Sequence, residues 1–141
     1  LSSNQLTEVP KGLENLTQLT KLYLIGNQLT DVKSLEKLMQ LTALRLDSNQ
    51  LTNVKGLEKL TQLTALGLRE NKLTSVKGLE KLTQLKYLYL HVNQLTDVKG
   101  LEKLTKLTRL TLSNNPALTK AQIDQLQKAL PKCKIYSNPT K

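Results

Sequence analysis

Aromatic residues are nearly absent from this 141-residue chain, which has four tyrosines and neither phenylalanine nor tryptophan. The length fits one domain, and its core must be aliphatic, with leucine supplying nearly all of it. A single cysteine, Cys133, excludes an intrachain disulfide. No apolar run approaches the ~20 residues of a membrane-spanning helix. We therefore expect no membrane insertion.

Residues that carry catalysis or bind metals are equally scarce. His91 is the only histidine, and Cys133 lies in a different part of the chain, so no Cys–His nucleophile pair is expected. The carboxylates are spread evenly, without the spacing of metal ligands. No glycine-rich phosphate-binding motif occurs. We predict a protein that is not an enzyme and that uses no cofactor or metal.

A repeated pattern, in contrast, runs through most of the chain. Leucine recurs at a spacing of 22 residues as Leu19, Leu41, Leu63, Leu85 and Leu107. Each full unit reads L-x-x-L-x-L-x-x-N-x-L-T-x-V-K-x-L-E-K-L. The asparagines of this pattern are Asn27, Asn49, Asn71, Asn93 and Asn115. Such a period is typical of solenoid proteins, in which a unit buries its apolar residues only against neighbouring units.

Each part of the unit predicts a local structure. The alternation L-x-L predicts a short strand with one buried face, and stacked units would pair these strands in parallel. The asparagine follows the strand, where its amide is expected to hydrogen-bond the backbone of neighbouring turns. The segment V-K-G-L-E-K-L has apolar residues three apart, which predicts a short helical or 3₁₀ turn on the opposite side.

This pattern resembles the leucine-rich repeat family, and the 22-residue unit is similar to that of bacterial internalins. The matching residues cover about residues 1–118. The resemblance implies a right-handed, curved α/β solenoid with a parallel sheet on the concave face and short helical turns on the convex face. In this family the concave sheet usually binds other macromolecules, most often proteins.

The two ends of the chain depart from the pattern. We divide the chain into repeats at 1–118 and a C-terminal cap and tail at 119–141. Thr119 followed by Gln122 is a capping-box pattern that predicts a helix, which Pro131 ends. The candidate inward positions of this helix are Ala121, Leu126, Ala129 and Leu130. Leu1 aligns with the end of a strand, so either the natural chain continues upstream or this uncapped edge pairs with another molecule, including a second copy.

Variation between units is concentrated at the outward positions of the strand and the residues after it. The second and third full units differ at five of 22 positions, and the third and fourth at eight. The convex lysines and glutamates are expected to be equally exposed, yet they stay uniform. We therefore predict that the concave face binds a macromolecular partner, in the first place a protein. The candidate partner-binding residues are Lys21, Tyr23, Ile25, Arg45, Asp47, Arg69, Glu70, Tyr87, Tyr89, His91, Val92 and Arg109.

Tyrosine and arginine dominate the energetics of many protein interfaces. The expected anchors are Tyr23, Arg45, Tyr87 and Tyr89, whereas Asp47, Arg69, Glu70, His91 and Arg109 would set specificity. Ala65 and Gly67 are expected to lie beside Tyr87 and Tyr89 of the next unit. Because both are small, we expect a shallow dip in the surface there.

The net charge of +10 leaves other functions open. Eight lysines recur on the expected convex side, and more follow residue 119, so the chain is also a candidate polyanion binder through its basic convex face and tail. Weak, non-specific polyanion binding at low salt is expected in any case. Units this similar also fit a structural spacer in a longer protein or an engineered repeat scaffold, and drift after duplication would explain the variation without a ligand.

Overall fold

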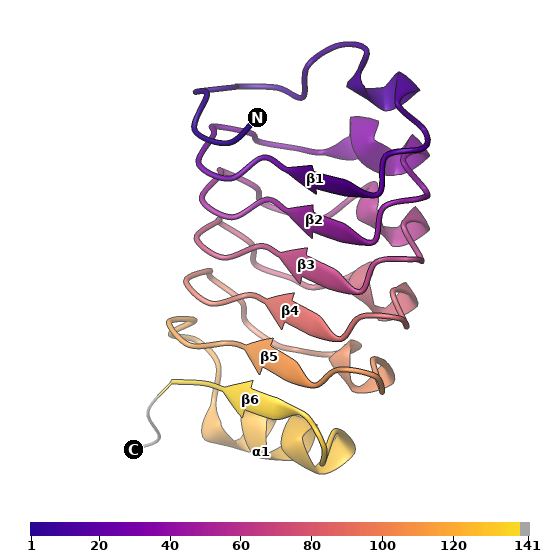
Figure 1. The fold of residues 1–141 in the computed structure, drawn as a ribbon. Helices are drawn as coiled ribbons and strands as arrows, with labels where there is room; N and C mark the ends of the chain where they lie inside the picture. The colour runs from indigo at the N-terminus through magenta and orange to yellow at the C-terminus, as the bar shows by residue number, and fades with distance from the viewer. Residues whose placement is uncertain (139–141) are drawn as a thin grey trace.

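The computed structural model describes residues 1–138, which form a curved, right-handed solenoid with one strand in each of six successive turns (Figure 1). The strands are β1 (Lys21–Tyr23), β2 (Ala43–Arg45), β3 (Ala65–Gly67), β4 (Tyr87–Tyr89), β5 (Arg109–Thr111) and β6 (Lys134–Tyr136). They pair in parallel in sequence order, with the central leucines Leu22, Leu44, Leu66, Leu88 and Leu110 in register. The α/β solenoid predicted from the repeat is confirmed.

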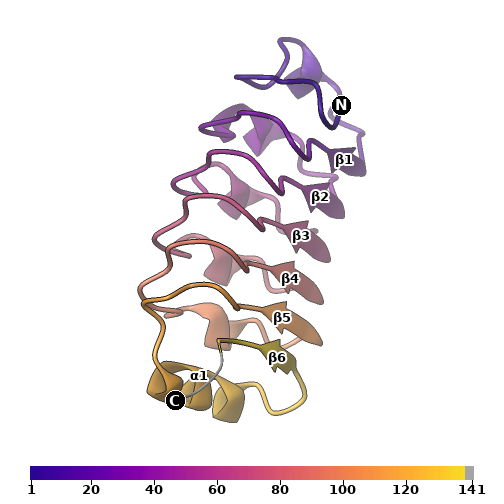
Figure 2. The same cartoon turned by 90° about the vertical axis from the view of Figure 1, so that its left-hand side faces the viewer.

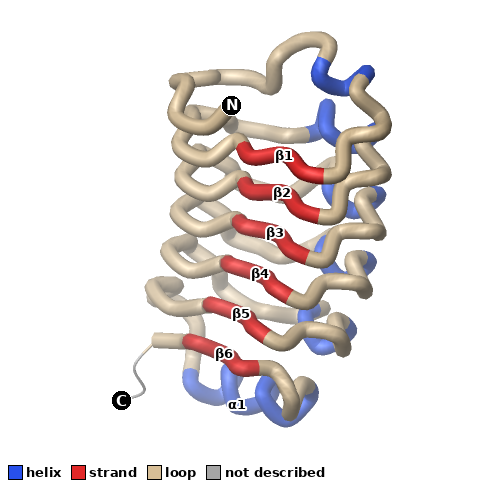
Figure 3. Tube along the Cα trace, viewed as in Figure 1, coloured by secondary structure: helices blue, strands red, loops and turns tan. Residues whose placement is uncertain are grey.

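Short 3₁₀ turns lie on the side of the solenoid away from the strands (Figures 2 and 3). They are η1 (Leu13–Asn15), η2 (Lys33–Lys37), η3 (Leu57–Lys59), η4 (Leu79–Lys81) and η5 (Leu101–Lys103). A left-handed glycine, such as Gly56 at φ 99°, precedes each of η1 and η3–η5. Ser34 stands at the equivalent position in the second turn, and there the 3₁₀ segment begins earlier, at Lys33.

The repeat leucines and valines form one continuous core. From Leu24 to Leu104 each of these residues is almost fully buried. Each of the turns in this range contributes residues from both the strand side and the 3₁₀ side, so none of them has a core of its own. The fold therefore depends on stacking, as the repeat pattern predicted.

A ladder of buried asparagines connects successive turns. The Asn71 Nδ2 donates to the carbonyl oxygens of Leu46 and Leu68, each at 3.1 Å, and its Oδ1 accepts from the Leu51 N–H at 3.0 Å. Asn49, Asn93 and Asn115 repeat this arrangement. The predicted role of the asparagine is thereby confirmed, since its side chain satisfies backbone groups that the turn buries.

The α-helix α1 (Lys120–Ala129) lies across the C-terminal end of the stack (Figure 1). The predicted capping box is present: the Gln122 N–H donates to Thr119 Oγ1 at 3.2 Å, and the Thr119 N–H donates to Gln122 Oε1 at 2.9 Å. The helix ends before Pro131, as expected. The last turn thus exchanges its 3₁₀ segment for a helix.

The inward face of α1 was only half predicted. Leu126 and Leu130 are buried and Ile123 packs against the core, whereas Ala121 and Ala129 are exposed. The expectation that the two alanines face inward is wrong. Positions 123, 126 and 130 follow the helical spacing of three and four residues, which fixes a single stripe and leaves the alanines outside it.

Strand β6 was not predicted from the sequence. It pairs with β5 at an offset of 25 residues, with Leu110 opposite Ile135, because α1 occupies more residues than a 3₁₀ turn. Cys133, just before it, is buried, and burial raises the pKa of its thiol. Asn138 then hydrogen-bonds the last ladder residue: its Nδ2 donates to the Asn115 carbonyl at 2.8 Å.

Residues 1–20 cover the opposite end incompletely. The Ser3 N–H donates to the Ile25 carbonyl and the Gln28 N–H donates to the Leu6 carbonyl, each at 2.7 Å. This first segment contains η1 and no strand, so β1 pairs only with β2 within residues 1–138. Leu16 is exposed here, although its counterpart in the next turn, Leu38, is buried.

Candidate partner-binding surface

The strand register arranges the outward side chains in columns that run along the solenoid. The column before the central leucine consists of Lys21, Ala43, Ala65, Tyr87, Arg109 and Lys134. The column after it consists of Tyr23, Arg45, Gly67, Tyr89, Thr111 and Tyr136. We call these columns, with the residue that precedes each strand and the second and third residues after each of β1–β5, the concave face.

Large side chains stand exposed on the concave face. Tyr23 is 49% exposed, Tyr87 43% and Val92 38%. The charged residues Lys21, Arg69, Glu70 and Arg109 are exposed as well. Ile25 is only half-exposed, because the first segment lies against it and its N–H donates to Ser2 Oγ at 3.1 Å. The predicted outward orientation of these residues is confirmed.

The predicted dip at Gly67 does not exist, because the Arg45 side chain occupies that space. Its guanidinium lies 5.2 Å from the centre of the Tyr89 ring, although the two residues are two strands apart. A Cβ atom at Gly67 would collide with Arg45 Nε and Asp47 Oδ1. The missing side chain lets a long neighbour cross the gap and stack on the tyrosine. Tyr89 is therefore half-buried.

Asp47 corrects a second expectation, since its side chain does not face the solvent. The residue is 3% exposed. Its carboxylate accepts from Arg45 Nε at 2.9 Å and from Arg45 Nη2, and it also accepts from the Arg69 backbone N–H at 3.2 Å. A buried carboxylate requires such donors. Asp47 holds Arg45 over Gly67, which is a positioning role.

Arg69 and Glu70 form a second, more exposed pair. Their Nη2 and Oε1 atoms are 3.1 Å apart, and Ser48 Oγ donates to Glu70 Oε2 at 2.9 Å. Both acidic groups predicted for this surface are thus already paired with arginines of the same surface. The middle of the concave face, at β2 and β3, is therefore close to electrically balanced.

His91 is held at the border of the concave face by Thr111. Its Nδ1 lies 2.6 Å from Thr111 Oγ1, which also accepts from the Leu90 N–H at 3.2 Å. Burial lowers the pKa of His91, and the nearby Arg69 lowers it further. At neutral pH the ring is therefore uncharged. Which of Nδ1 and the threonine hydroxyl donates depends on the tautomer of the neutral ring.

We expect His91 to titrate below the ordinary histidine value of about 6.5. Because the folded state disfavours the charged ring, the unfolded chain binds more protons below that pH. The contribution of His91 to the free energy of unfolding is therefore fully present above pH 6.5. It is lost as the pH falls from there through the folded-state pKa. The only imidazole signal in the proton NMR spectrum gives this pKa directly, and Arg69→Gln should raise it. A native pKa at or above 6.5 would contradict the assignment.

Val92 occupies a strained backbone position. Its φ is 59°, and the equivalent residues Gly26, Ser48, Glu70 and Asn114 are also left-handed, at φ from 55° to 71°. Glycine and asparagine tolerate this region, whereas a β-branched residue is an outlier there. Val92 thus combines backbone strain with an exposed apolar side chain, and neither feature stabilises the fold. Such strain often occurs at functional sites.

Val92→Asn, which installs the residue found at position 114, is expected to raise the free energy of unfolding by about 1 kcal/mol. The melting temperature should rise by about 3 °C. Ile25→Asn is the matched control, because Ile25 is a neighbouring position without a positive φ and should lose stability instead. An unchanged or lower melting temperature for Val92→Asn would show that the valine is not strained.

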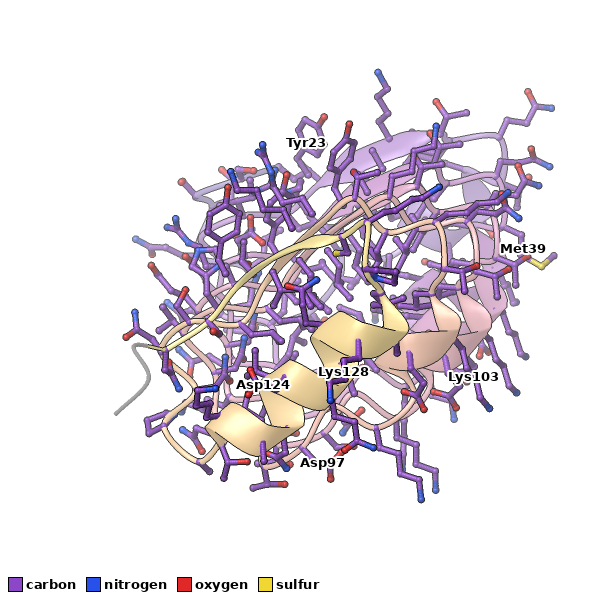
Figure 4. The ribbon with its side chains drawn as sticks, turned by 90° about the horizontal axis from the view of Figure 1, so that it is seen from below. Tyr23, Met39, Asp97, Lys103, Asp124 and Lys128 are labelled. Carbon is purple, nitrogen blue, oxygen red and sulfur yellow. The ribbon has the colours of Figure 1, made fainter. Side chains whose placement is uncertain are left out.

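Other kinds of site find little support in the described part of the chain. No group of three or more His, Cys, Asp or Glu residues within 1–138 is arranged to hold a metal ion. No helix in this range is long and apolar enough to cross a membrane. A groove of about 420 Å³ lies between η5 and α1 and is lined in part by Asp97, Val98 and Leu126. It is not on the concave face: Figure 4 shows Asp97 on a different side of the molecule from Tyr23.

Family comparison agrees with the geometry. Sequence models described as "Leucine rich repeat" and "Leucine Rich repeats (2 copies)" match residues 1–51, 61–100 and 83–128, which together make up most of the chain. The chain is a leucine-rich repeat protein. The family and its fold are non-enzymatic binding scaffolds, and leucine-rich repeat domains are generally protein-interaction modules. A binding role follows for this chain.

Solved structures place the repeats in the internalin-like class. A leucine-rich repeat protein of Leptospira interrogans has 36% identity and a TM-score of 0.86 over 93% of this chain and 34% of its own. Internalin C2 of Listeria monocytogenes has 27% identity and a TM-score of 0.65, over 95% of this chain and 67% of its own. The functional domain of InlJ, from the same species, shares the fold at 23% identity and a TM-score of 0.83, over 99% and 34%.

The leucine-rich repeat chain spans about a third of the length of the Leptospira protein and of InlJ. The comparison with curated proteins found no match. Leptospira and Listeria are both bacterial genera, in agreement with the expected repeat class.

Proposed function

We propose that this leucine-rich repeat protein recognises a protein partner through its concave face. The observation that carries the proposal is the exposure of Tyr23, Tyr87 and Val92 on one face, in repeats whose packing residues are the same from one full unit to the next. A tyrosine or valine at these positions adds nothing to the leucine core. Large, rigid side chains of this kind supply most of the binding energy in protein interfaces.

The remaining predicted residues have graded roles in this proposal. Tyr23 and Tyr87 are the anchors, and Val92 adds apolar contact. Tyr89 contributes the part of its ring that the Arg45 guanidinium does not cover. Lys21, Ile25, Arg69, Glu70, His91 and Arg109 form the surrounding surface that sets register and specificity. Asp47 acts only through Arg45, because it is buried.

The proposal is tested by capturing proteins from an extract of the organism that encodes the chain, at about 0.3 M salt to screen weak charge contacts. The unmodified chain is compared with Tyr23→Ala/Tyr87→Ala. Leu16→Ala/Met39→Ala is the matched control, because it removes two exposed apolar side chains that lie outside the concave face. All three chains should melt within about 2 °C of each other, since exposed side chains contribute little to stability.

A protein captured by the unmodified chain and the control, but not by the tyrosine variant, supports recognition by the concave face. If the tyrosine variant captures the same proteins as the unmodified chain, the concave face does not bind them. If only the control loses the partner, the binding surface lies elsewhere on the solenoid.

A second candidate function, binding of a polyanion by the convex face, is favoured by one feature of the 3₁₀ turns. The carboxylates of Glu58, Glu80 and Glu102 accept from the N–H of the glycine two residues earlier, at 2.8 to 2.9 Å. Hydrogen bonds from the backbone N–H groups of Glu80 and Gly78 lower the pKa of Glu80. The carboxylates of these glutamates are thus hydrogen-bonded within their own turns. The only convex ion pair within 1–138 joins Lys59 to Glu36, at 3.6 Å. Polyanion binding would disappear as salt rises, whereas capture at the tyrosines would persist.

A further inference from the structure

Three cations gather at the C-terminal end of the concave face. Lys86 immediately precedes β4, and its carbonyl oxygen accepts from the Arg109 N–H at 3.2 Å. Arg109 on β5 lies directly opposite Lys134 on β6. All three residues are exposed. None of them has a carboxylate within 4.0 Å among residues 1–138.

The repeat itself offers a more stable alternative at two of these positions. Thr42, Thr64 and Thr108 stand where Lys86 stands in its own turn, and each donates its hydroxyl to the carbonyl oxygen of the residue 22 positions earlier, at 3.1 to 3.3 Å. Lys86 interrupts this threonine ladder and makes no such bond. Ala43 and Ala65 likewise precede the central leucine where Arg109 does in β5.

The pairing of Arg109 with Lys134 is unfavourable in the isolated chain. Like charges directly opposite each other on neighbouring strands repel. Arg45 on β2 and Arg69 just after β3, in contrast, are neutralised by Asp47 and Glu70. Charge thus changes along the concave face, from balanced at β2–β3 to positive at β4–β6. An anion bound at β4–β6 would relieve the repulsion.

Two tyrosines border these cations. Tyr87, in register with Arg109, and Tyr136, two residues after Lys134, are both exposed. The Lys134 Nζ lies 5.5 Å from the centre of the Tyr136 ring. A sulfated polysaccharide has no aromatic groups and would use the cations alone, whereas a protein segment would use both the charges and the rings. The combination therefore favours a protein ligand.

We propose that this basic patch, composed of Lys86, Arg109 and Lys134 with Tyr87 and Tyr136, binds an acidic segment of the protein partner. The inference rests on the proposed function. Neighbouring strands are about 4.8 Å apart, so the three strands span about 10 Å. Two carboxylates at alternate residues of an extended segment are separated by about 7 Å. The flexible lysine and arginine side chains cover that spacing, so a run of two or three acidic residues fits the patch.

The test uses backbone amide NMR shifts while a short acetylated peptide of alternating aspartate and glutamate is titrated at about 50 mM salt. We expect the largest shifts around residues 86, 109 and 134. The variant Lys86→Thr/Arg109→Ala gives both positions the residues of other turns, so the fold is preserved. It should weaken the peptide affinity about fivefold, which corresponds to losing two exposed charge contacts. The control Lys55→Ala/Lys77→Ala removes the same charge from the convex face and should leave the affinity unchanged.

Shifts centred on the convex lysines would overturn the proposal. So would equal weakening in the two variants, or a heparin fragment that binds more tightly than the peptide and responds equally to both variants. The capture experiment, repeated at about 50 mM salt so that charge contacts are not screened, separates this inference from the function on which it rests. A partner that is lost with Tyr23→Ala/Tyr87→Ala but kept with Lys86→Thr/Arg109→Ala overturns the acidic segment and leaves concave recognition intact.

Discussion

Asn71→Ala is expected to lower the free energy of unfolding by about 3 kcal/mol and the melting temperature by about 10 °C. The substitution leaves the buried Leu51 N–H without its acceptor, since the Asn71 Oδ1 is its partner at 3.0 Å. An orphaned buried donor alone costs about 1–3 kcal/mol. The bonds from Nδ2 to the Leu46 and Leu68 carbonyls disappear as well, although the neighbouring asparagines still reach these oxygens.

Asn53→Ala provides the control for this substitution. Asn53 is exposed and accepts only from the Lys55 N–H, at 3.0 Å, in a local turn. Its loss should change the free energy of unfolding by no more than about 0.5 kcal/mol. Chemical denaturation of both variants measures the difference. Equal losses at the two positions would show that the asparagine ladder does not hold the turns together.

Arg45→Ala is expected to lower the free energy of unfolding by about 2 kcal/mol, although Arg45 lies on the surface. Its removal leaves the Asp47 carboxylate without its ion-pair partner. That carboxylate stays buried, since the Asp47 side chain is 4% exposed. Breaking a buried ion pair from one side costs about 3–5 kcal/mol, and the partial exposure of Arg45 reduces that figure. The stacking on Tyr89 is lost at the same time.

A double-mutant cycle isolates this coupling. Arg45→Ala/Asp47→Ala should recover part of the stability that Arg45→Ala loses, because no unpaired carboxylate then remains buried. Strictly additive losses would contradict the positioning role of Asp47. Since Arg45 also supports the fold, its effect on partner binding must be compared at equal folded fraction, whereas Tyr23 and Tyr87 need no such correction.

The fold was predictable because the same local pattern occurs in every turn up to about residue 118. The L-x-L alternation, the asparagine after it and the valine–leucine spacing each specify a local conformation, and their repetition makes the stacking evident. Strand β6 escaped prediction because its sequence, Lys-Ile-Tyr, lies in the cap and lacks the leucine pattern. Its pairing with β5 depends on how α1 fits the last turn, which is a property of the tertiary structure.

The candidate surface was predictable only in outline. Strand alternation correctly indicated which side chains leave the core, as at Tyr23 and Tyr87. It carries no information on how a long side chain bends across its neighbours, so Arg45 was not expected over Gly67 and Asp47 was not expected to be buried. The strain at Val92 did leave a signal, because glycine at position 26 and asparagine at 114 mark that position as left-handed.

Hydroxyl-radical footprinting of the complex with the captured protein tests the central claim most directly. Met39 is 55% exposed in the turn after η2 and points out on a different side of the molecule from Tyr23 (Figure 4), so it serves as an internal reference. Recognition by the concave face predicts that Tyr23 and Tyr87 become protected from oxidation while Met39 reacts as in the free chain. Protection of Met39 with unchanged tyrosines would place the partner on another surface and contradict the account.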